Sequence, residues 1–262
     1  MILSNKFMAS SKSWKKIFDD YKILDNDFSK LPFPISAVQI KKSVQKFKST
    51  SEKEVRILCK QDTREDRPEI FIKNGLFLLP TSNGVFSIIK GEGYVDIPEI
   101  KTPIKKYNSK LKFELDTSKI GNSEMQHLDF AYAASLIRTF VDDPSLVLTI
   151  RGRKYTPEFD FMVGKQKIET KNVQTEVDAG YEGETKLVLV EAKNTFTHNT
   201  IIRQLYYPFR QWQECTKKKV YTIFFEKSAD DIYSIWQFGF TDPNNYNSIK
   251  LLKAERFQII IM

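Results

Sequence analysis

The sequence predicts a mixed α/β fold of the α+β kind, in two parts. The chain has 262 residues, of which 41% are hydrophobic and 13% aromatic, enough for one large core or two small ones. Segments with apolar residues at helical spacing are interspersed with short runs rich in Val, Ile and Phe, which favour strands. The net charge of +8 lies entirely in residues 1–120, which hold 23 basic and 15 acidic side chains. We therefore expect a basic N-terminal module over 1–105, a linker over 106–120 and a second domain over 121–262.

The N-terminal module is predicted to combine a helix with a small sheet. Trp14, Ile17 and Phe18 recur at helical spacing, and Leu31-Pro32-Phe33-Pro34 breaks the chain after them. Ser82-Asn83-Gly84 is typical of a turn between two strands. The expected elements are a helix over 11–21, a helix or strand over 35–48, and strands over 54–60, 69–79 and 85–90.

The second domain is predicted to follow the order α-β-β-β-α-β. Asn122 or Ser123 can cap a helix, and Asp142-Asp143-Pro144 ends it. Alternating and continuous apolar runs then indicate strands on both sides of a second helix. The expected elements are a helix over 123–141, strands over 158–163, 168–179 and 187–193, a helix over 200–216, and strands over 220–226, 232–240 and 257–261.

Composition excludes several kinds of chemistry. Cys59 and Cys215 are the only cysteines, which argues against a disulfide scaffold and a thiolate zinc site. His127 and His198 are the only histidines, so a multi-histidine metal site is disfavoured. No apolar run approaches the roughly 18 residues of a membrane span, and the N-terminus has no signal-peptide pattern. We expect a cytoplasmic protein whose chemistry depends on carboxylates, lysine and a hard cation.

The surplus of positive charge indicates a polyanionic partner. Lysines such as Lys41 and Lys42 would attract nucleic acid by releasing its counterions, without regard to sequence. A lysine-rich soluble surface explains the same charge equally well.

The strongest chemical signal is a charged end on a buried strand. Leu187-Val188-Leu189-Val190 indicates a strand buried on both faces, and Glu191-Ala192-Lys193 follows it directly. Buried charges are unfavourable unless they are paired or bind a metal. Because side chains alternate along a strand, Glu191 and Lys193 should emerge on the same side, roughly 6–7 Å apart.

A hairpin would bring a second carboxylate to this point. If the chain turns at Glu184-Thr185, residues whose numbers sum to 369 lie opposite one another. Asp178 then faces Glu191, and Glu176 faces Lys193, at about 5 Å. Two carboxylates this close repel one another unless a cation lies between them or one is protonated. Instead of a cation site, this strand end could hold a surface ion pair between Glu176 and Lys193. Asp160 is the alternative to Asp178 as the aspartate that accompanies Glu191.

Asp178, twelve intervening residues and then Glu191-Ala192-Lys193 resemble the signature of PD-(D/E)xK nucleases. The α-β-β-β-α-β order is similar to the core of that superfamily, a mixed sheet flanked by helices. The phrases around Asp178 and Glu191, followed by Ile202-Arg203-Gln204-Leu205-Tyr206-Tyr207, look most like bacterial type II restriction endonucleases. Val177 stands where the family pattern has proline, a departure shared by many members.

The resemblance implies roles for particular residues. Asp178, Glu191 and the Ala192 carbonyl would hold Mg²⁺, with Mn²⁺ tolerated, and Lys193 would position the attacking water. Glu124 at the start of the first helix would also reach the metal, although a carboxylate there equally suits the helix dipole. Arg203, Tyr207 and Arg210 share a face of the second helix by their i, i+4, i+7 spacing, and a solvated helix face is the alternative to phosphate contact there. The DNA contacts implied are Arg203, Gln204, Tyr207, Arg210 and Asn194.

The implied activity is sequence-specific hydrolysis of double-stranded DNA, leaving a 5′-phosphate and a 3′-hydroxyl. A homodimer is expected if the target is a palindrome, and a cognate DNA methyltransferase would complete a restriction–modification system. The strand–turn–strand ending of the N-terminal module suggests a winged helix. The alternatives are a repair or recombination nuclease of the same superfamily, a non-catalytic DNA-binding regulator, and a cation-binding scaffold.

Overall fold

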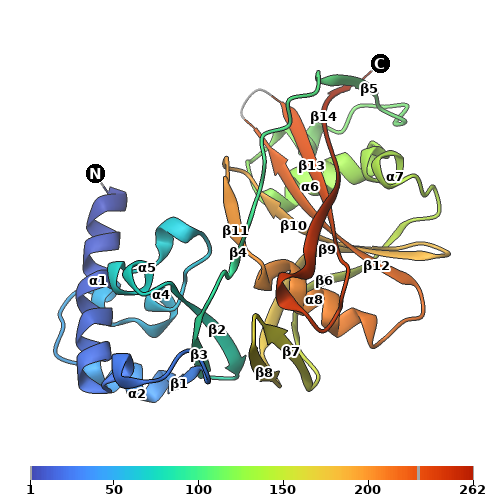
Figure 1. Ribbon diagram of the computed structural model, residues 1–262. Helices are drawn as coiled ribbons and strands as arrows, with labels where there is room; N and C mark the ends of the chain where they lie inside the picture. The colour runs from blue at the N-terminus through green and yellow to red at the C-terminus, as the bar shows by residue number, and fades with distance from the viewer. Residues whose placement is uncertain (1, 229–230, 262) are drawn as a thin grey trace.

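The computed structural model describes residues 2–228 and 231–261, which form two modules lying side by side (Figure 1). The smaller N-terminal module has helices around a three-stranded sheet, and the larger module is built on a seven-stranded sheet. The expectation of a mixed α+β protein is confirmed.

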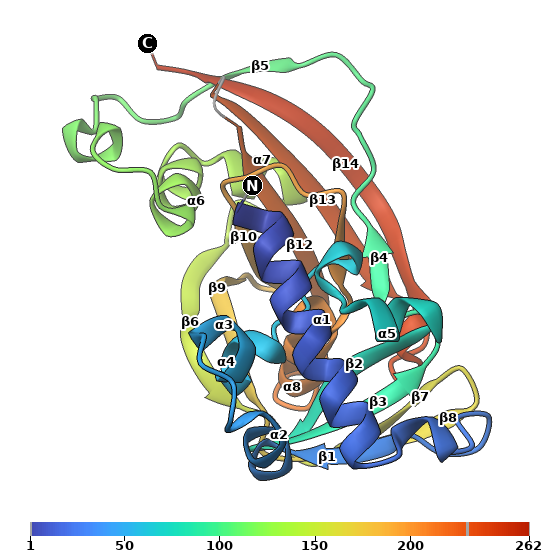
Figure 2. The same ribbon diagram turned by 90° about the vertical axis from the view of Figure 1, so that its left-hand side faces the viewer.

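The N-terminal module packs its helices over an antiparallel sheet of order β1-β3-β2. Trp14, Ile17 and Phe18 on the first helix are buried as expected, and Trp14 meets Phe71 edge to face. Figure 2 shows this helix along the outer side of the module. The elements are α1 (Ile2–Asp20), η1 (Ile23–Asp25), β1 (Phe33–Ser36), α2 (Ala37–Val44), α3 (Thr50–Lys53), α4 (Val55–Leu58), η2 (Arg64–Asp66), α5 (Glu69–Lys73), β2 (Leu76–Ser82) and β3 (Val85–Lys90).

Two strand predictions in this module need correction: one segment is helical, and the other begins as a helix before its strand. Residues 54–60 contain α4, and the strand expected over 69–79 begins as α5 before β2. Their Val, Ile and Phe residues suit a strand, but burial of Leu58 and Phe71 against α1 selects short helices. The turn at residues 82–84 is confirmed, with Gly84 at φ +75°.

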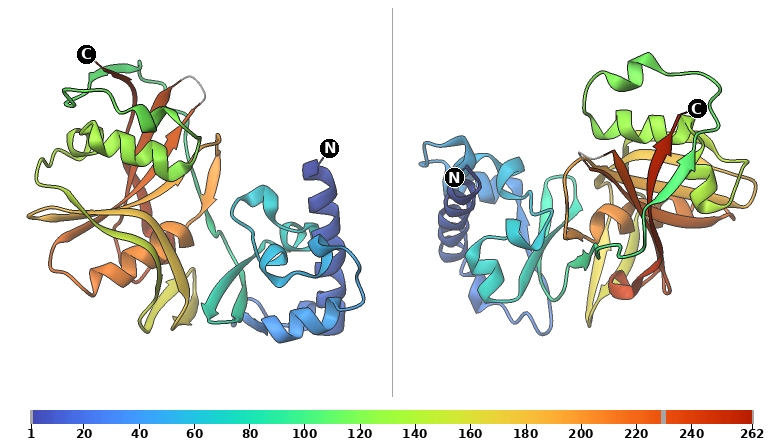
Figure 3. Two further views of the ribbon diagram at one scale, coloured as in Figure 1. Left: turned by 180° about the vertical axis from the view of Figure 1, so that it is seen from behind. Right: turned by 90° about the horizontal axis from the view of Figure 1, so that it is seen from above.

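The larger module has helices on both faces of its sheet, whose order is β5-β14-β13-β12-β10-β9-β6. β10 runs parallel to β12 and antiparallel to β9. Figure 3 shows α6 and α7 (green) and α8 (orange) on different sides of the strands. The elements are β4 (Tyr94–Asp96), β5 (Lys105–Asn108), η3 (Asp116–Lys119), α6 (Glu124–Ala133), α7 (Leu136–Val141), β6 (Val147–Tyr155), β7 (Phe159–Val163), β8 (Gln166–Thr170), β9 (Gln174–Glu182), β10 (Lys186–Lys193), β11 (Asn199–Ile201), α8 (Arg203–Gln213), β12 (Lys219–Lys227), β13 (Ile232–Phe240), η4 (Tyr246–Ser248) and β14 (Ile249–Ile260).

The element order differs from the expectation before β10. The helix expected over 123–141 is broken at Ser135, whose φ is +66°, and the expected strand over 168–179 is broken at Asn172, whose φ is +57°. β6 was not expected, whereas β7 and β8 form a separate hairpin outside the main sheet. The three strands of this sheet between α7 and α8 are therefore β6, β9 and β10. β5, at the start of the expected linker, pairs with β14 as an edge strand.

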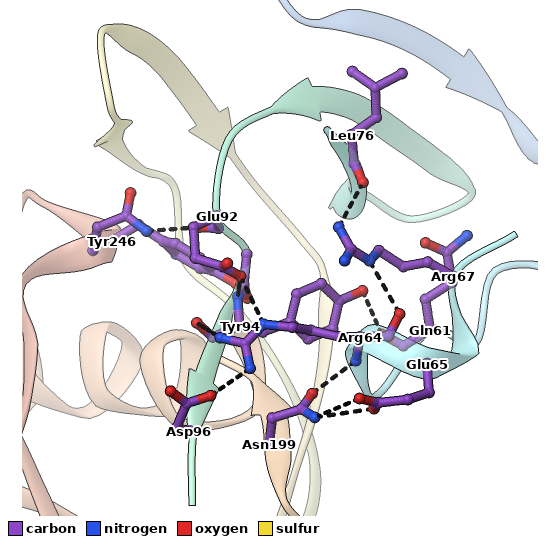
Figure 4. A network of polar contacts seen from close by, with 12 residues as sticks. Gln61, Arg64, Glu65, Arg67, Leu76, Glu92, Tyr94, Asp96, Asn199 and Tyr246 are labelled. Carbon is purple, nitrogen blue, oxygen red and sulfur yellow. Dashed lines mark hydrogen bonds and ion pairs between the residues drawn. The ribbon is translucent and has the colours of Figure 1, made fainter. Parts of the chain in front are cut away.

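The two modules are joined by apolar and polar contacts. Phe77 of β2 stacks on Tyr246, which in turn stacks on Phe161 of β7. Figure 4 shows polar contacts between the modules. The Asn199 side chain accepts a hydrogen bond from the Arg64 backbone N–H at 2.7 Å, and it donates to the Glu65 carboxylate. β11, which contains Asn199, also pairs with β4. The segment that follows β10 is thus tied to the N-terminal module.

We expect Asn199→Ala to lower the free energy of unfolding by about 1–3 kcal/mol, because the Arg64 N–H loses the acceptor that the buried Asn199 side chain provides. Asn199→Asp should be at least as harmful, since it puts a second carboxylate beside Glu65. Urea denaturation of the full chain measures both effects. The exposed Asn244 is the matched control, and Asn244→Ala should change stability by less than about 0.5 kcal/mol.

Candidate active site

The β9–β10 hairpin has the register expected from the sequence. Leu187 pairs with Glu182 and Val190 with Ala179, so paired residue numbers sum to 369. The ladder ends at Val190, and the next opposed positions are Asp178 and Glu191. The two acidic residues therefore lie where the strands separate.

This separation gives Asp178 a specific structural role. Beyond Val190 the β10 backbone no longer pairs with β9, and the Ala192 N–H instead donates to Asp178 Oδ2 at 2.7 Å. Glu191 forms an ion pair with Lys193 two residues along the same strand. The Glu191 and Lys193 side chains are only 12% and 22% exposed. One carboxylate is thus held by a backbone amide and the other by an ammonium group.

The negative charge of the two carboxylates is not fully balanced by the positive charge near them. The pKa of Glu191 is raised to about 7, mainly by burial; the charge of Lys193 opposes this rise and the nearby charge of Asp178 contributes to it. Burial also raises the pKa of Asp178, opposed by the Ala192 N–H and by Lys193. Burial lowers the pKa of Lys193, but the charge and hydrogen bond of Glu191, together with the charges of Glu124 and Asp178, raise it overall. One lysine facing two acids leaves negative charge available for a further cation.

These groups face a cleft of about 740 Å³ between the modules. Asp178, Glu191 and Lys193 line it from the sheet, and Arg203 and Gln204 line it from α8. The N-terminal module supplies the opposing side, including Arg56, Lys60, Gln61, Asp62 and Asn83. The cleft therefore joins the acidic centre to positively charged and amide side chains of both modules.

Glu124 belongs to the same centre. It is the first residue of α6 and lines the cleft, and its charge raises the pKa of both Asp178 and Lys193. Ser123 caps the helix instead, since its side chain accepts from the Gln126 N–H. Capping therefore does not account for the position of Glu124.

The oxygen donors at this point suit a hard divalent cation. Asp178 and Glu191 could supply one carboxylate each, and the Ala192 carbonyl directly follows Glu191 in the chain. Within residues 2–228 and 231–261, no three His, Cys, Asp or Glu side chains gather as a complete metal-binding group. The set that fits is thus two carboxylates with a backbone carbonyl, and excess negative charge is the observation that favours it.

Two of the expected DNA contacts are wrong. Tyr207 is 0% exposed, and its hydroxyl donates to the Pro80 carbonyl at 2.9 Å. Arg210 is 6% exposed and donates to the carbonyls of Asp160 at 3.1 Å and Pro243 at 2.8 Å. Both side chains join structural elements, because α8 is covered by the β7–β8 hairpin on the face expected to meet DNA. Of the contacts expected on this helix, Arg203 and Gln204 line the cleft.

The other predicted residues lie as follows. Glu176 forms an ion pair with Arg153 at 3.2 Å, so the expected contact with Lys193 is wrong. Asp160 pairs with Lys167 on the separate hairpin, which removes it as a rival to Asp178. Asn194 donates to the Asn122 carbonyl and links the end of β10 to the start of α6. Lys41 and Lys42 are exposed on the last turn of α2.

Sequence reasoning missed the opposing wall of the cleft. Arg56, Lys60 and Gln61 lie in and just after a segment expected to be a strand, and Asp62 follows them. The charge of Asp62 raises the pKa of Glu191, which brings the N-terminal module into the electrostatics of the site. No spacing along the chain indicates this contact, because it depends on how the two modules meet.

Comparisons with known proteins divide the chain in two. A family model described as domain of unknown function DUF6997 matches residues 89–258, and one described as DUF6996 matches residues 11–88. No curated protein and no solved structure matches the chain. In the described part of the chain, the helices are too short or too polar to cross a membrane.

We expect Arg210→Met to destabilise the fold by roughly 1.5–3 kcal/mol, because the carbonyls of Asp160 and Pro243 lose the charged donor that the buried Arg210 side chain supplies. Arg153→Met, which removes a largely exposed partner of Glu176, should cost less than about 1 kcal/mol. Thermal and urea unfolding measure the difference. Equal, small losses for both variants would contradict a structural role for Arg210.

Proposed function

The chain belongs to the DUF6997 family, and we propose that it is a Mg²⁺-dependent endodeoxyribonuclease related to the PD-(D/E)xK enzymes. One observation carries the proposal: Asp178 and Glu191 lie at opposed positions of a forked hairpin, with Lys193 beside them at the edge of a cleft. This is the set of groups that metal-assisted phosphodiester hydrolysis needs.

The topology supports the proposal. The helices α6 and α7, the strands β6, β9 and β10, the helix α8 and the strand β12 follow the order α-β-β-β-α-β. Asp178 lies on the second of these strands and Glu191-Ala192-Lys193 ends the third, as in the superfamily pattern. The order of these four strands in the sheet is β6-β9-β10-β12, with the last pair parallel.

The residues divide the work of hydrolysis. The carboxylates of Asp178 and Glu191 would hold the ion together with the Ala192 carbonyl. A bound Mg²⁺ would supply a water of lowered pKa and neutralise charge on the phosphate. The Ala192 N–H keeps the Asp178 carboxylate in orientation, and Glu191 holds the Lys193 ammonium where it can orient a water. Arg203 on α8 would contact a substrate phosphate.

The N-terminal module supports DNA as the substrate. Its order of helix, strand, helices and two-stranded hairpin, with sheet order β1-β3-β2, is similar to a winged helix. It also carries most of the excess positive charge of the chain, including exposed Lys41 and Lys42. We therefore propose a type II restriction endonuclease acting on double-stranded DNA, as a homodimer if the target is palindromic.

The direct test is incubation of the full chain with unmethylated phage DNA, with and without Mg²⁺, followed by sequencing of the fragment ends. Discrete fragments with 5′-phosphate ends that require Mg²⁺ are expected. Cutting confined to branched DNA or free ends would instead indicate a repair or recombination nuclease. DNA binding without any cutting in Mg²⁺ or Mn²⁺ would contradict the proposed activity.

We expect Asp178→Asn, Glu191→Gln and Lys193→Ala each to lower the cleavage rate by a factor on the order of 10²–10³ or more, since each removes a group that stabilises developing charge. Lys193→Ala should still bind DNA. Asp160→Asn is the matched control, because that carboxylate lies on the β7–β8 hairpin and should leave cleavage unchanged. Single-turnover rates, with circular dichroism to verify folding, distinguish these outcomes.

A further inference from the structure

We propose that Gln61 of the N-terminal module reads the edge of a base beside the active site, with adenine as the preferred base. The inference rests on the proposed nuclease function and deepens it, because it names a sequence preference at the cleft. Gln61 follows α4 and lies on the side of the cleft opposite Asp178 and Glu191.

The Gln61 side chain is buried without a partner. It is 3% exposed, and neither its amide nitrogen nor its amide oxygen has a hydrogen-bond partner among the described residues. The backbone is held in place, since the Tyr94 hydroxyl donates to the Gln61 carbonyl at 3.1 Å (Figure 4). A buried amide that lacks both partners is unfavourable. Its position lining the cleft provides a route by which a ligand could satisfy both groups.

A second unpaired group lines the same cleft from the other module. The Nε–H of Arg203 on α8 is buried and has no partner among the described residues. A guanidinium group suits a phosphate oxygen, whereas a carboxamide suits a base edge. The two groups thus match the two ends of a nucleotide held between the modules, next to Asp178 and Glu191.

The amide itself favours one base. A carboxamide offers one donor and one acceptor side by side, which matches N7 and the N6 amino group of adenine in the major groove. Guanine presents two acceptors there and cannot pair with both atoms of the amide. A rotation about the side-chain torsions of Gln61 would bring its amide into the cleft. The amide nitrogen and oxygen, which have no partner in their buried position, would then each form a hydrogen bond with the base.

Selection of DNA by binding tests this role without cleavage. Two forms of the full chain are compared, Lys193→Ala alone and Lys193→Ala combined with Gln61→Met. Each is used to select bound duplexes from a random DNA pool in the presence of Ca²⁺. We expect the Gln61 protein to enrich a site with adenine at one fixed position, and Gln61→Met to lose the preference there while keeping it elsewhere. Replacing that adenine by a purine without the N6 amino group, or by 7-deazaadenine, should weaken binding roughly 5- to 150-fold with Gln61 and have little effect with Gln61→Met.

The controls separate this role from a structural one. Gln45→Ala, an exposed change in the same module, should leave the selected site unchanged. The melting temperature of Gln61→Met should equal or exceed that of Gln61, because the substitution removes unpaired buried polar atoms. Identical selected sites for Gln61 and Gln61→Met, or no enrichment with either, would overturn the inference. Failure of the nuclease proposal would appear separately, as absence of cutting by the unaltered chain.

Discussion

The site depends on one hydrogen bond at the fork of a hairpin, from the Ala192 N–H to the Asp178 carboxylate. Where β9 and β10 separate, a backbone donor needs an acceptor, and the side chain of Asp178 supplies it in place of the missing strand. The same separation opens the space in which Glu191 and Lys193 meet. A defect in strand pairing is thus what creates a polar, chemically useful pocket at the end of the apolar run Leu187–Val190.

The second property of this fork is that it holds more negative than positive charge in a buried place. Removing two carboxylates from water costs free energy that one ammonium group does not fully offset. Glu124 and Asp62 add further negative charge from α6 and from the other module. Such concentration of like charge destabilises the chain by itself, and this is the usual condition of sites that bind a cation or substrate.

The sequence was most informative where a local pattern determines geometry. The apolar run Leu187–Val190 and the turn after Glu182 were enough to predict the register that brings Asp178 opposite Glu191, because alternation along strands is regular. Spacing on α8 predicted a common face for Arg203, Tyr207 and Arg210 but not what covers it. The β7–β8 hairpin buries the last two, and such a long-range contact has no signal in helical periodicity.

The apolar contacts between the modules have a consequence for how the chain can be divided. Phe77 and Leu79 belong to the same cluster of buried residues as Phe161, Tyr206 and Tyr246, so one continuous interior crosses the junction between the two family segments. Cutting the polypeptide at that junction would expose these aromatic rings to solvent. Each half would then carry an apolar surface prone to aggregation. The two segments are therefore best regarded as a single cooperative folding unit.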